Sequence, residues 1–280
     1  MTELADGVFI GCSLNHAVTD GTSFWNFFNT FAELSRGVKR ISRIPDFNRD
    51  SILISPAVLK LPAGGPTVTF SGDAPIRERI FRFSRESILK LKAKVNNNTT
   101  KREVNGGIDF AELMGKHSND TRKYPDGKLT PLAWLMNAVS RETIQSIPTY
   151  ATAGDVLGKD LRWCAEQLNK NVLAHGNATV RKYVEDWEKD PRCFPLGNFD
   201  GAMITMGSSP RFPMYDNDFG WGRPVAVQSG RANKFDGKIS AFPGRDGSGS
   251  GSVDLEVVLA PETMAGLLSD PEFMQYVSSY

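Results

Sequence analysis

The first forty residues constrain the fold most strongly. In them a segment with the composition of a strand passes directly into a strongly amphipathic helix. Residues 7–16, GVFIGCSLNH, follow an Asp-Gly turn and have the apolar composition of a buried strand. Residues 22–37 carry apolar side chains at the i, i+3, i+4, i+7 spacing of a helix that ends at Gly37, namely Phe24, Phe27, Phe28, Phe31 and Leu34. A short loop between a strand and a helix is a common place for chemistry in α/β folds.

The remaining periodic segments predict a mixed fold. Helices are expected at 84–95, where Ser84 is a suitable N-cap, at about 154–175 and 177–189, and after the N1 proline Pro261. Strands are expected at 76–83, 199–206, 224–229, 237–242 and 252–260. Residues 108–150 give weak signals. The whole pattern predicts an α/β protein of the α+β type.

Composition argues against several kinds of partner. The 280 residues include 33 basic and 32 acidic side chains, so the net charge of +1 gives no general attraction to nucleic acid or to an anionic membrane. No apolar run is long enough to span a bilayer, and the start, MTELADG, has no features of a signal peptide. Cys12, Cys164 and Cys193 are odd in number and widely spaced, which fits a reducing cytoplasm and indicates neither disulfides nor a metal site.

The loop between the first strand and helix contains the sequence HAVTDG, which has two interpretations. His16 is a candidate general base, because a neutral imidazole can take a proton from a hydroxyl or amine near pH 7. Asp20, four residues later, would then support it. The alternative is structural: His16 packs in the loop, and Asp20 is the N-cap of the following helix. This segment by itself leaves both interpretations open.

A second unusual segment, DFGWGRP at 218–224, has the character of a tight turn. Gly220 and Gly222 permit positive φ angles, and the Asp218 carboxylate can accept hydrogen bonds from backbone N–H groups of such a turn. Protein kinases also contain a DFG triplet. The other kinase motifs, including the Gly-rich loop and the HRD loop, do not accompany it here.

Together, HxxxDG and DFGWGRP resemble the paired motifs of the plant BAHD acyltransferase family. The resemblance covers residues 1 to about 95 and about 144 to 280, including NKFDGKISAFPG at 233–244. It implies a two-domain fold of the chloramphenicol-acetyltransferase type, with a tunnel between the domains. It also implies transfer of an acyl group from acyl-CoA, a co-substrate and not a bound cofactor, to a hydroxyl or amine of a small plant metabolite. Family members are usually monomeric.

The resemblance also implies roles for individual residues. His16 would be the general base, and Asp20 would hold the catalytic loop through an arginine. Ser208 would help to stabilise an oxyanion in the tunnel, while Pro210 stands where the family often has an aromatic residue. A structural loop remote from the reacting atoms would be formed by Asp218, Phe219, Gly220, Trp221 and Gly222.

Two departures from the family pattern lead to further expectations. Family members are about half as long again, so residues 1–45 are expected to be a remnant of the first domain, which is otherwise largely missing. Residues 46–75 would be a crossover linker, and 76–280 the second domain, with an internal gap near 141–144. The arginine partner of Asp20 is not recognisable, although Arg122 and Arg141 are possible substitutes.

These departures predict a weak or inactive enzyme whose Asp20 lacks its arginine partner. The alternative function is therefore a catalytically silent relative that acts as a binding protein, or a nonfunctional fragment. Uncovered apolar faces are also expected to make the chain associate with itself.

Overall fold

The structure is a computed structural model of the chain. It describes residues 1–16, 18–45, 74–96, 125–126, 129–140, 143–191, 201, 203–231, 234–247 and 249–278. Most of the expected linker 46–75 lies outside these ranges, as do residues 97–124, which include the candidate Arg122, and the residues Arg141 and Cys193.

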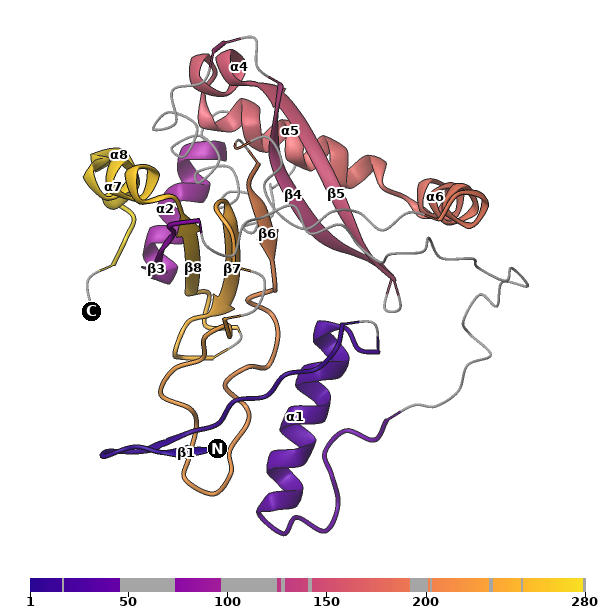
Figure 1. Ribbon diagram of the computed structural model, residues 1–280, viewed down its shortest axis with the longest axis vertical. Helices are drawn as coiled ribbons and strands as arrows, with labels where there is room; N and C mark the ends of the chain where they lie inside the picture. Colours follow the sequence, from indigo (N-terminus) through magenta and orange to yellow (C-terminus); the bar gives the residue numbers. More distant parts are fainter. Residues whose placement is uncertain are drawn as a thin grey trace.

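A six-stranded mixed sheet forms the centre of the fold, with the strand order β3-β8-β7-β6-β4-β5 (Figure 1). The pairs β6–β7 and β4–β6 are parallel, and the other neighbouring pairs are antiparallel. The strands are β3 (Arg77–Phe83), β4 (Leu129–Ser140), β5 (Thr143–Thr152), β6 (Thr205–Gly207), β7 (Lys238–Pro243) and β8 (Val253–Leu259).

Helices cover one face of this sheet and enclose the main core. They are α2 (Arg85–Asn96), α4 (Ala153–Gly158), α5 (Leu161–Ala174), α7 (Pro261–Ser269) and α8 (Pro271–Met274). Leu91 of α2, Leu168 of α5 and Phe273 of α8 are buried in the same apolar cluster as the alternate strand residues Phe81 and Leu255. Helix α6 (Asn177–Lys189) extends away from the sheet (Figure 1).

The loop after β6 lies against the opposite face of β7 and β8, and helix α1 (Gly21–Ser35) packs against that loop beyond one end of the sheet (Figure 1). A second buried cluster forms there from Met214, Tyr215 and Phe242, and Trp25 of α1 and Phe212 pack against it. Because this loop covers β8, the alternate residues Asp254 and Glu256 are buried as well, with 7% and 5% of their surface exposed. The location of α1 and of the HxxxDG motif therefore depends on the loop 208–231.

Several elements agree with the sequence pattern. The helix after the HAVTDG loop, the strand–helix pair β3–α2, helix α6, strands β7 and β8, and the helix begun by Pro261 all form within two residues of their expected positions. The Ser84 hydroxyl accepts a hydrogen bond from Ser87 N at 3.1 Å, as an N-cap should.

Other expectations were wrong. The expected buried strand 7–16 is reduced to β2 (Val8–Phe9), which within the described ranges pairs only with β1 (Thr2–Glu3). It is exposed, because a strand is buried only where neighbouring elements cover it. The helix expected at 154–175 is two helices, since Asp160 caps a new one by accepting from Trp163 N at 2.9 Å. Residues 224–229 form no strand. Of the strand expected at 199–206, the described residues form a strand only at Thr205–Gly207, and residues 199, 200 and 202 lie outside the described ranges. The hairpin β4–β5 occupies a region of weak signals.

Candidate active site

His16 lies in an exposed turn immediately before α1. The turn is closed by a backbone hydrogen bond from Val18 N to Asn15 O at 3.1 Å. Among the described residues, no hydrogen bond holds the His16 side chain. The imidazole is therefore accessible, as a general base must be, and its orientation depends on the turn.

Asp20 is the N-cap of α1, as the structural interpretation of the HAVTDG loop proposes. Its Oδ1 accepts a hydrogen bond from Ser23 N at 2.7 Å, and its φ and ψ angles of −96° and 178° are those of an extended cap residue. No basic side chain forms an ion pair with Asp20 within the part of the chain that the structure describes. The two candidate arginines are outside that part.

The DFGWG loop is organised by its leading carboxylate. Asp218 Oδ1 accepts hydrogen bonds from Gly220 N at 2.7 Å and Gly222 N at 2.9 Å, while Oδ2 accepts one from Arg36 Nη1 at 3.0 Å. The bond from Gly220 N, with help from Gly222 N and Arg36, holds the pKa of Asp218 below its ordinary value. Both glycines have positive φ angles, 106° and 93°, which explains the need for glycine at these two positions. Trp221 is exposed.

The loop that contains DFGWG lies along α1. The Phe219 ring meets the edges of Phe28 and Phe31 with centroid distances of 5.5 and 5.9 Å. Between these two residues of the helix, Asn29 Nδ2 donates a hydrogen bond to Pro213 O at 3.0 Å. The structure thus brings the helix that follows HxxxDG into contact with the second motif.

Arg36 is a site residue that sequence reasoning did not identify. It follows the last residue of α1, and its partner Asp218 is 182 residues away in the chain. A basic residue at the end of a helix ordinarily interacts with the last carbonyl groups of that helix. No local signal in the sequence distinguishes Arg36 from such a residue.

Ser208 directly follows β6 and has an unusual backbone conformation. Its φ of 67° is in the left-handed region, which a non-glycine residue rarely adopts. The residue is exposed, and the next segment is tightened by a hydrogen bond from Phe212 N to Ser209 O at 3.1 Å. Strained residues of this kind are held in place by the structure around them and often occur at functional sites.

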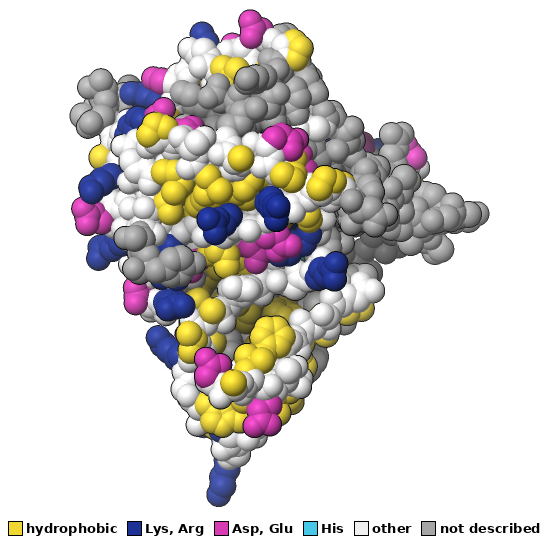
Figure 2. Space-filling view, turned by 60° about the vertical axis from the view of Figure 1, so that its left-hand side comes forward, with side chains coloured by type: hydrophobic (Ala, Val, Ile, Leu, Met, Phe, Trp, Pro, Cys, Tyr) yellow, Lys and Arg dark blue, Asp and Glu magenta, His cyan; other side chains and the backbone are white. Residues whose placement is uncertain are grey.

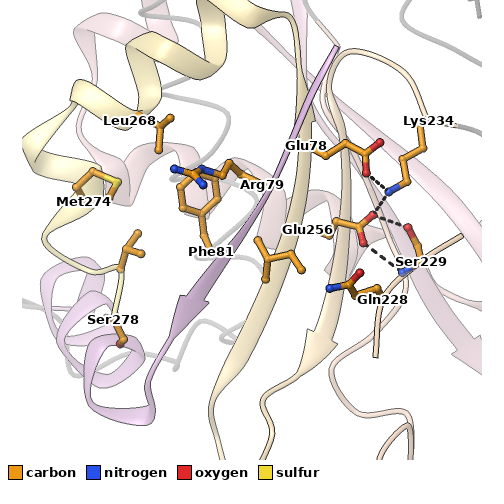
Figure 3. A pocket seen from close by; sticks show the side chains of 12 residues that line it. Glu78, Arg79, Phe81, Gln228, Ser229, Lys234, Glu256, Leu268, Met274 and Ser278 are labelled. Atoms are coloured by element: carbon orange, nitrogen blue, oxygen red, sulfur yellow. Dashed lines mark hydrogen bonds and ion pairs between the residues drawn. The ribbon is translucent and has the colours of Figure 1, made fainter. Parts of the chain in front are cut away.

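A cavity of about 530 Å³ lies elsewhere, at the edge strand β3 and beside α7 and α8. Figure 3 shows its apolar wall, which includes Phe81, Leu268 and Met274, opposite a charged wall. None of the residues expected at the active site lines this cavity. On the face shown in Figure 2, hydrophobic side chains also lie beside acidic and basic ones, as they do in the cavity.

The charged wall of this cavity anchors the chain after the DFGWG loop. Lys234 Nζ donates hydrogen bonds to Glu78 Oε2 at 2.5 Å and to Glu256 Oε1 at 2.6 Å. Ser229 N donates to Glu256 Oε2 at 3.2 Å, and the Ser229 hydroxyl also bonds to this carboxylate. We therefore interpret this network as a structural support of the loop 208–231.

The described residues show neither a metal site nor a membrane-spanning helix. They contain no cluster of three His, Cys, Asp or Glu side chains that could hold a metal ion. They also contain no helix with the length and apolar character needed to cross a membrane.

Comparisons of sequence identify related proteins. The profile of the family described as "Transferase family" matches residues 1–138 and 137–274. An uncharacterized acetyltransferase of Arabidopsis thaliana is 30% identical over 98% of this chain and 66% of its own length. BAHD acyltransferase DCR of the same plant is 29% identical over 98% of this chain and 61% of its own length. The chain thus spans about two thirds of the length of these curated relatives.

Comparisons of structure identify the fold. TRI101 of F. sporotrichioides, solved in complex with coenzyme A and T-2, aligns with a TM-score of 0.70 at 14% identity, covering 92% of this chain and 64% of its own. Vinorine synthase aligns with a TM-score of 0.67 at 18% identity, covering 93% and 60% of the two chains. The architecture is therefore of the chloramphenicol-acetyltransferase-like type. Since the family profile matches almost the whole chain, this protein belongs to the Transferase family, with the plant BAHD acyltransferases among its relatives.

Proposed function

We propose that this protein takes part in moving an acyl group from an acyl-CoA thioester to a hydroxyl or amine of a small plant metabolite in the cytoplasm, with His16 as the general base. The observation that carries the proposal is the contact between the two motifs. The helix capped by Asp20 of HxxxDG is the same helix on which the DFGWG loop packs, through Phe219 and Arg36. The two motifs that carry the family resemblance are thus joined through one helix of the folded chain.

The proposed chemistry follows from the groups at this site. The neutral imidazole of His16 takes the proton of the acceptor hydroxyl or amine, and the acceptor attacks the thioester carbonyl carbon. The oxygen of the tetrahedral intermediate then carries a negative charge, which a hydrogen bond from the Ser208 hydroxyl would stabilise. Collapse of the intermediate breaks the carbon–sulfur bond, and the imidazolium returns its proton to the departing CoA thiolate.

The alternative is a catalytically silent relative that binds a ligand or partner, or a fragment without function. The observation that favours it is the cap formed by Asp20. Its carboxylate is used by Ser23 N, and no arginine among the described residues holds it. A general base misplaced by about 1 Å can lose about 10²-fold in rate.

The test is a panel of acyl-CoA donors, including acetyl-CoA and a hydroxycinnamoyl-CoA, with hydroxylated and amino acceptors. Release of free CoA thiol and formation of the acylated product are both measured. His16→Ala should lower the rate by about 10²–10⁴ without lowering Tm, because the side chain is exposed. His175→Ala, at the end of α5, is the matched control and should retain the rate.

Each outcome bears on one of the two functions. Full activity in His16→Ala would exclude His16 as the base. Absence of product with every donor in the wild-type chain, while the chain remains folded, would favour the silent relative.

A further inference from the structure

The start of α1 is in unusually close contact with the loop after β6. Gly21 is the first residue of the helix, and a Cβ atom built on it would lie only 2.6 Å from Cζ and 2.7 Å from Cε2 of Phe212. Real Cβ atoms do not come this close to another carbon. The φ angle of Gly21 is not positive, so the backbone conformation does not require glycine here. The glycine is needed for space, which the Phe212 ring occupies.

Phe212, which is partly buried, also packs against a buried cluster. The ring packs against the buried cluster of Met214, Tyr215 and Phe242, together with Trp25. Trp25 is one helical turn after Gly21, so both residues lie on the same side of α1. Two backbone bonds, from Phe212 N to Ser209 O at 3.1 Å and from Met214 N to Phe212 O at 2.8 Å, fix the surrounding turn.

The position of this contact links two proposed site residues. Phe212 is in the same tight loop as Ser208, and Gly21 is adjacent to Asp20, which caps the helix after the His16 turn. A shift of the ring would therefore change the placement of the His16 turn relative to Ser208. The hydrogen bond from Asn29 Nδ2 to Pro213 O holds the adjacent part of the loop to the same helix.

We infer that Phe212 is a positioning residue, which sits in the space left by Gly21 and sets the location of His16 relative to the Ser208 loop. This inference rests on the proposed function for its catalytic consequence. The contact itself can be tested without turnover, by observing the His16 imidazole directly.

The experiment compares Gly21→Ala with Gly21→Ala combined with Phe212→Leu, which removes the ring atoms that collide with the new methyl group. Gly158→Ala is the matched control, because a Cβ at Gly158, the last residue of α4, meets no atom within 4 Å. The readouts are kcat, KM for the acyl donor, and the NMR signal of the His16 Cε1–H group, assigned with His16→Gln.

Gly21→Ala should lower kcat by about 10²-fold with little change in KM, and should move the His16 signal. The double variant should recover most of kcat and return the signal towards its wild-type position. Gly158→Ala should match the wild type in every readout. An unchanged His16 signal and kcat in Gly21→Ala would overturn the inference, as would failure of the double variant to recover either.

Two further outcomes remain decisive. If Gly21→Ala does not fold, Phe212→Leu alone should still move the His16 signal, and an unchanged signal in that variant would overturn the inference. If the wild-type chain has no turnover, the proposed function fails, whereas the NMR comparison still decides whether Phe212 positions His16.

Discussion

Arg36, at the C-terminal end of α1, donates a hydrogen bond from Nη1 to Asp218 Oδ2 at 3.0 Å, across 182 residues of sequence. The two side chains have about a third of their surface exposed, 33% and 30%. The other carboxylate oxygen of Asp218 holds two backbone N–H groups of its own loop. Asp218 therefore organises the DFGWG loop and also attaches it to the helix that follows the HxxxDG motif.

Replacing Asp218 with Ala should lower Tm more than replacing Arg36 with Ala. Asp218→Ala removes the acceptor of two backbone N–H groups as well as the ion pair, whereas Arg36→Ala removes only a partly exposed ion pair, which contributes little. Thermal unfolding by circular dichroism measures both. Equal losses of Tm in the two variants would show that the loop does not depend on its internal hydrogen bonds.

The contribution of the Asp218 charge should depend on pH. The bond from Gly220 N, together with those from Gly222 N and Arg36, lowers the pKa of Asp218 in the folded state below its ordinary value. The unfolded chain therefore binds the proton more readily, so the stabilisation is complete above about pH 4 and is lost as pH falls through the folded pKa.

Asp218→Asn, which retains an oxygen acceptor but no charge, is the comparison for this effect. The wild-type chain should have the higher Tm at pH 6, and the difference in Tm between the two proteins should decrease as the pH falls below about 4. A difference that stays constant from pH 6 to pH 3 would contradict the assignment to the carboxylate.

The ion pair between Lys234 and Glu256 should contribute more to the free energy of unfolding than the ion pair between Arg36 and Asp218. The side chains of Lys234 and Glu256 are only 9% and 6% exposed, so Lys234→Met leaves a buried carboxylate without its cation. This change should cost about 3–5 kcal/mol of unfolding free energy, measured by urea denaturation. Glu78→Gln, in which the lost carboxylate is about half exposed, should cost at most about 1 kcal/mol. Similar costs for the two variants would contradict this account.

The exposed side of α1 should cause the chain to associate with itself. Phe27 and Phe31 stack with a centroid distance of 6.3 Å and are 52% and 51% exposed, whereas Phe28 on the packed side is 8% exposed. Phe27→Glu combined with Phe31→Lys removes this apolar area and adds a favourable i, i+4 pair. Light scattering should show less association, whereas Tm should fall slightly because Phe31 also contacts Phe219. Phe28→Glu, the control, should lower Tm because it places a carboxylate on the packed side of α1. A wild-type chain that is a monodisperse monomer in light scattering would contradict the prediction.

Local patterns in the sequence were sufficient for many elements of this fold. The spacing of Phe24, Phe28 and Phe31 predicts α1, the alternation of VDLEVVL predicts β8, and Pro261 marks the start of α7. These predictions succeed because a helix face, a strand face and an N1 proline are each defined by residues within one or two turns of each other. The two motifs are also local, and their resemblance to a family agrees with the family match.

Only the tertiary structure decided what these local elements do together. The apolar segment 7–16 is exposed because no element in the described part of the chain covers it, and Asp254 and Glu256 are buried because a distant loop covers them. In the sequence, Gly21 is an ordinary residue after a helix cap. In the fold, the ring of Phe212, 191 positions later, leaves no room for a side chain there. Such contacts depend on which surfaces meet when the whole chain packs, and that depends on the shape of every intervening segment, not on residue type or spacing at either position.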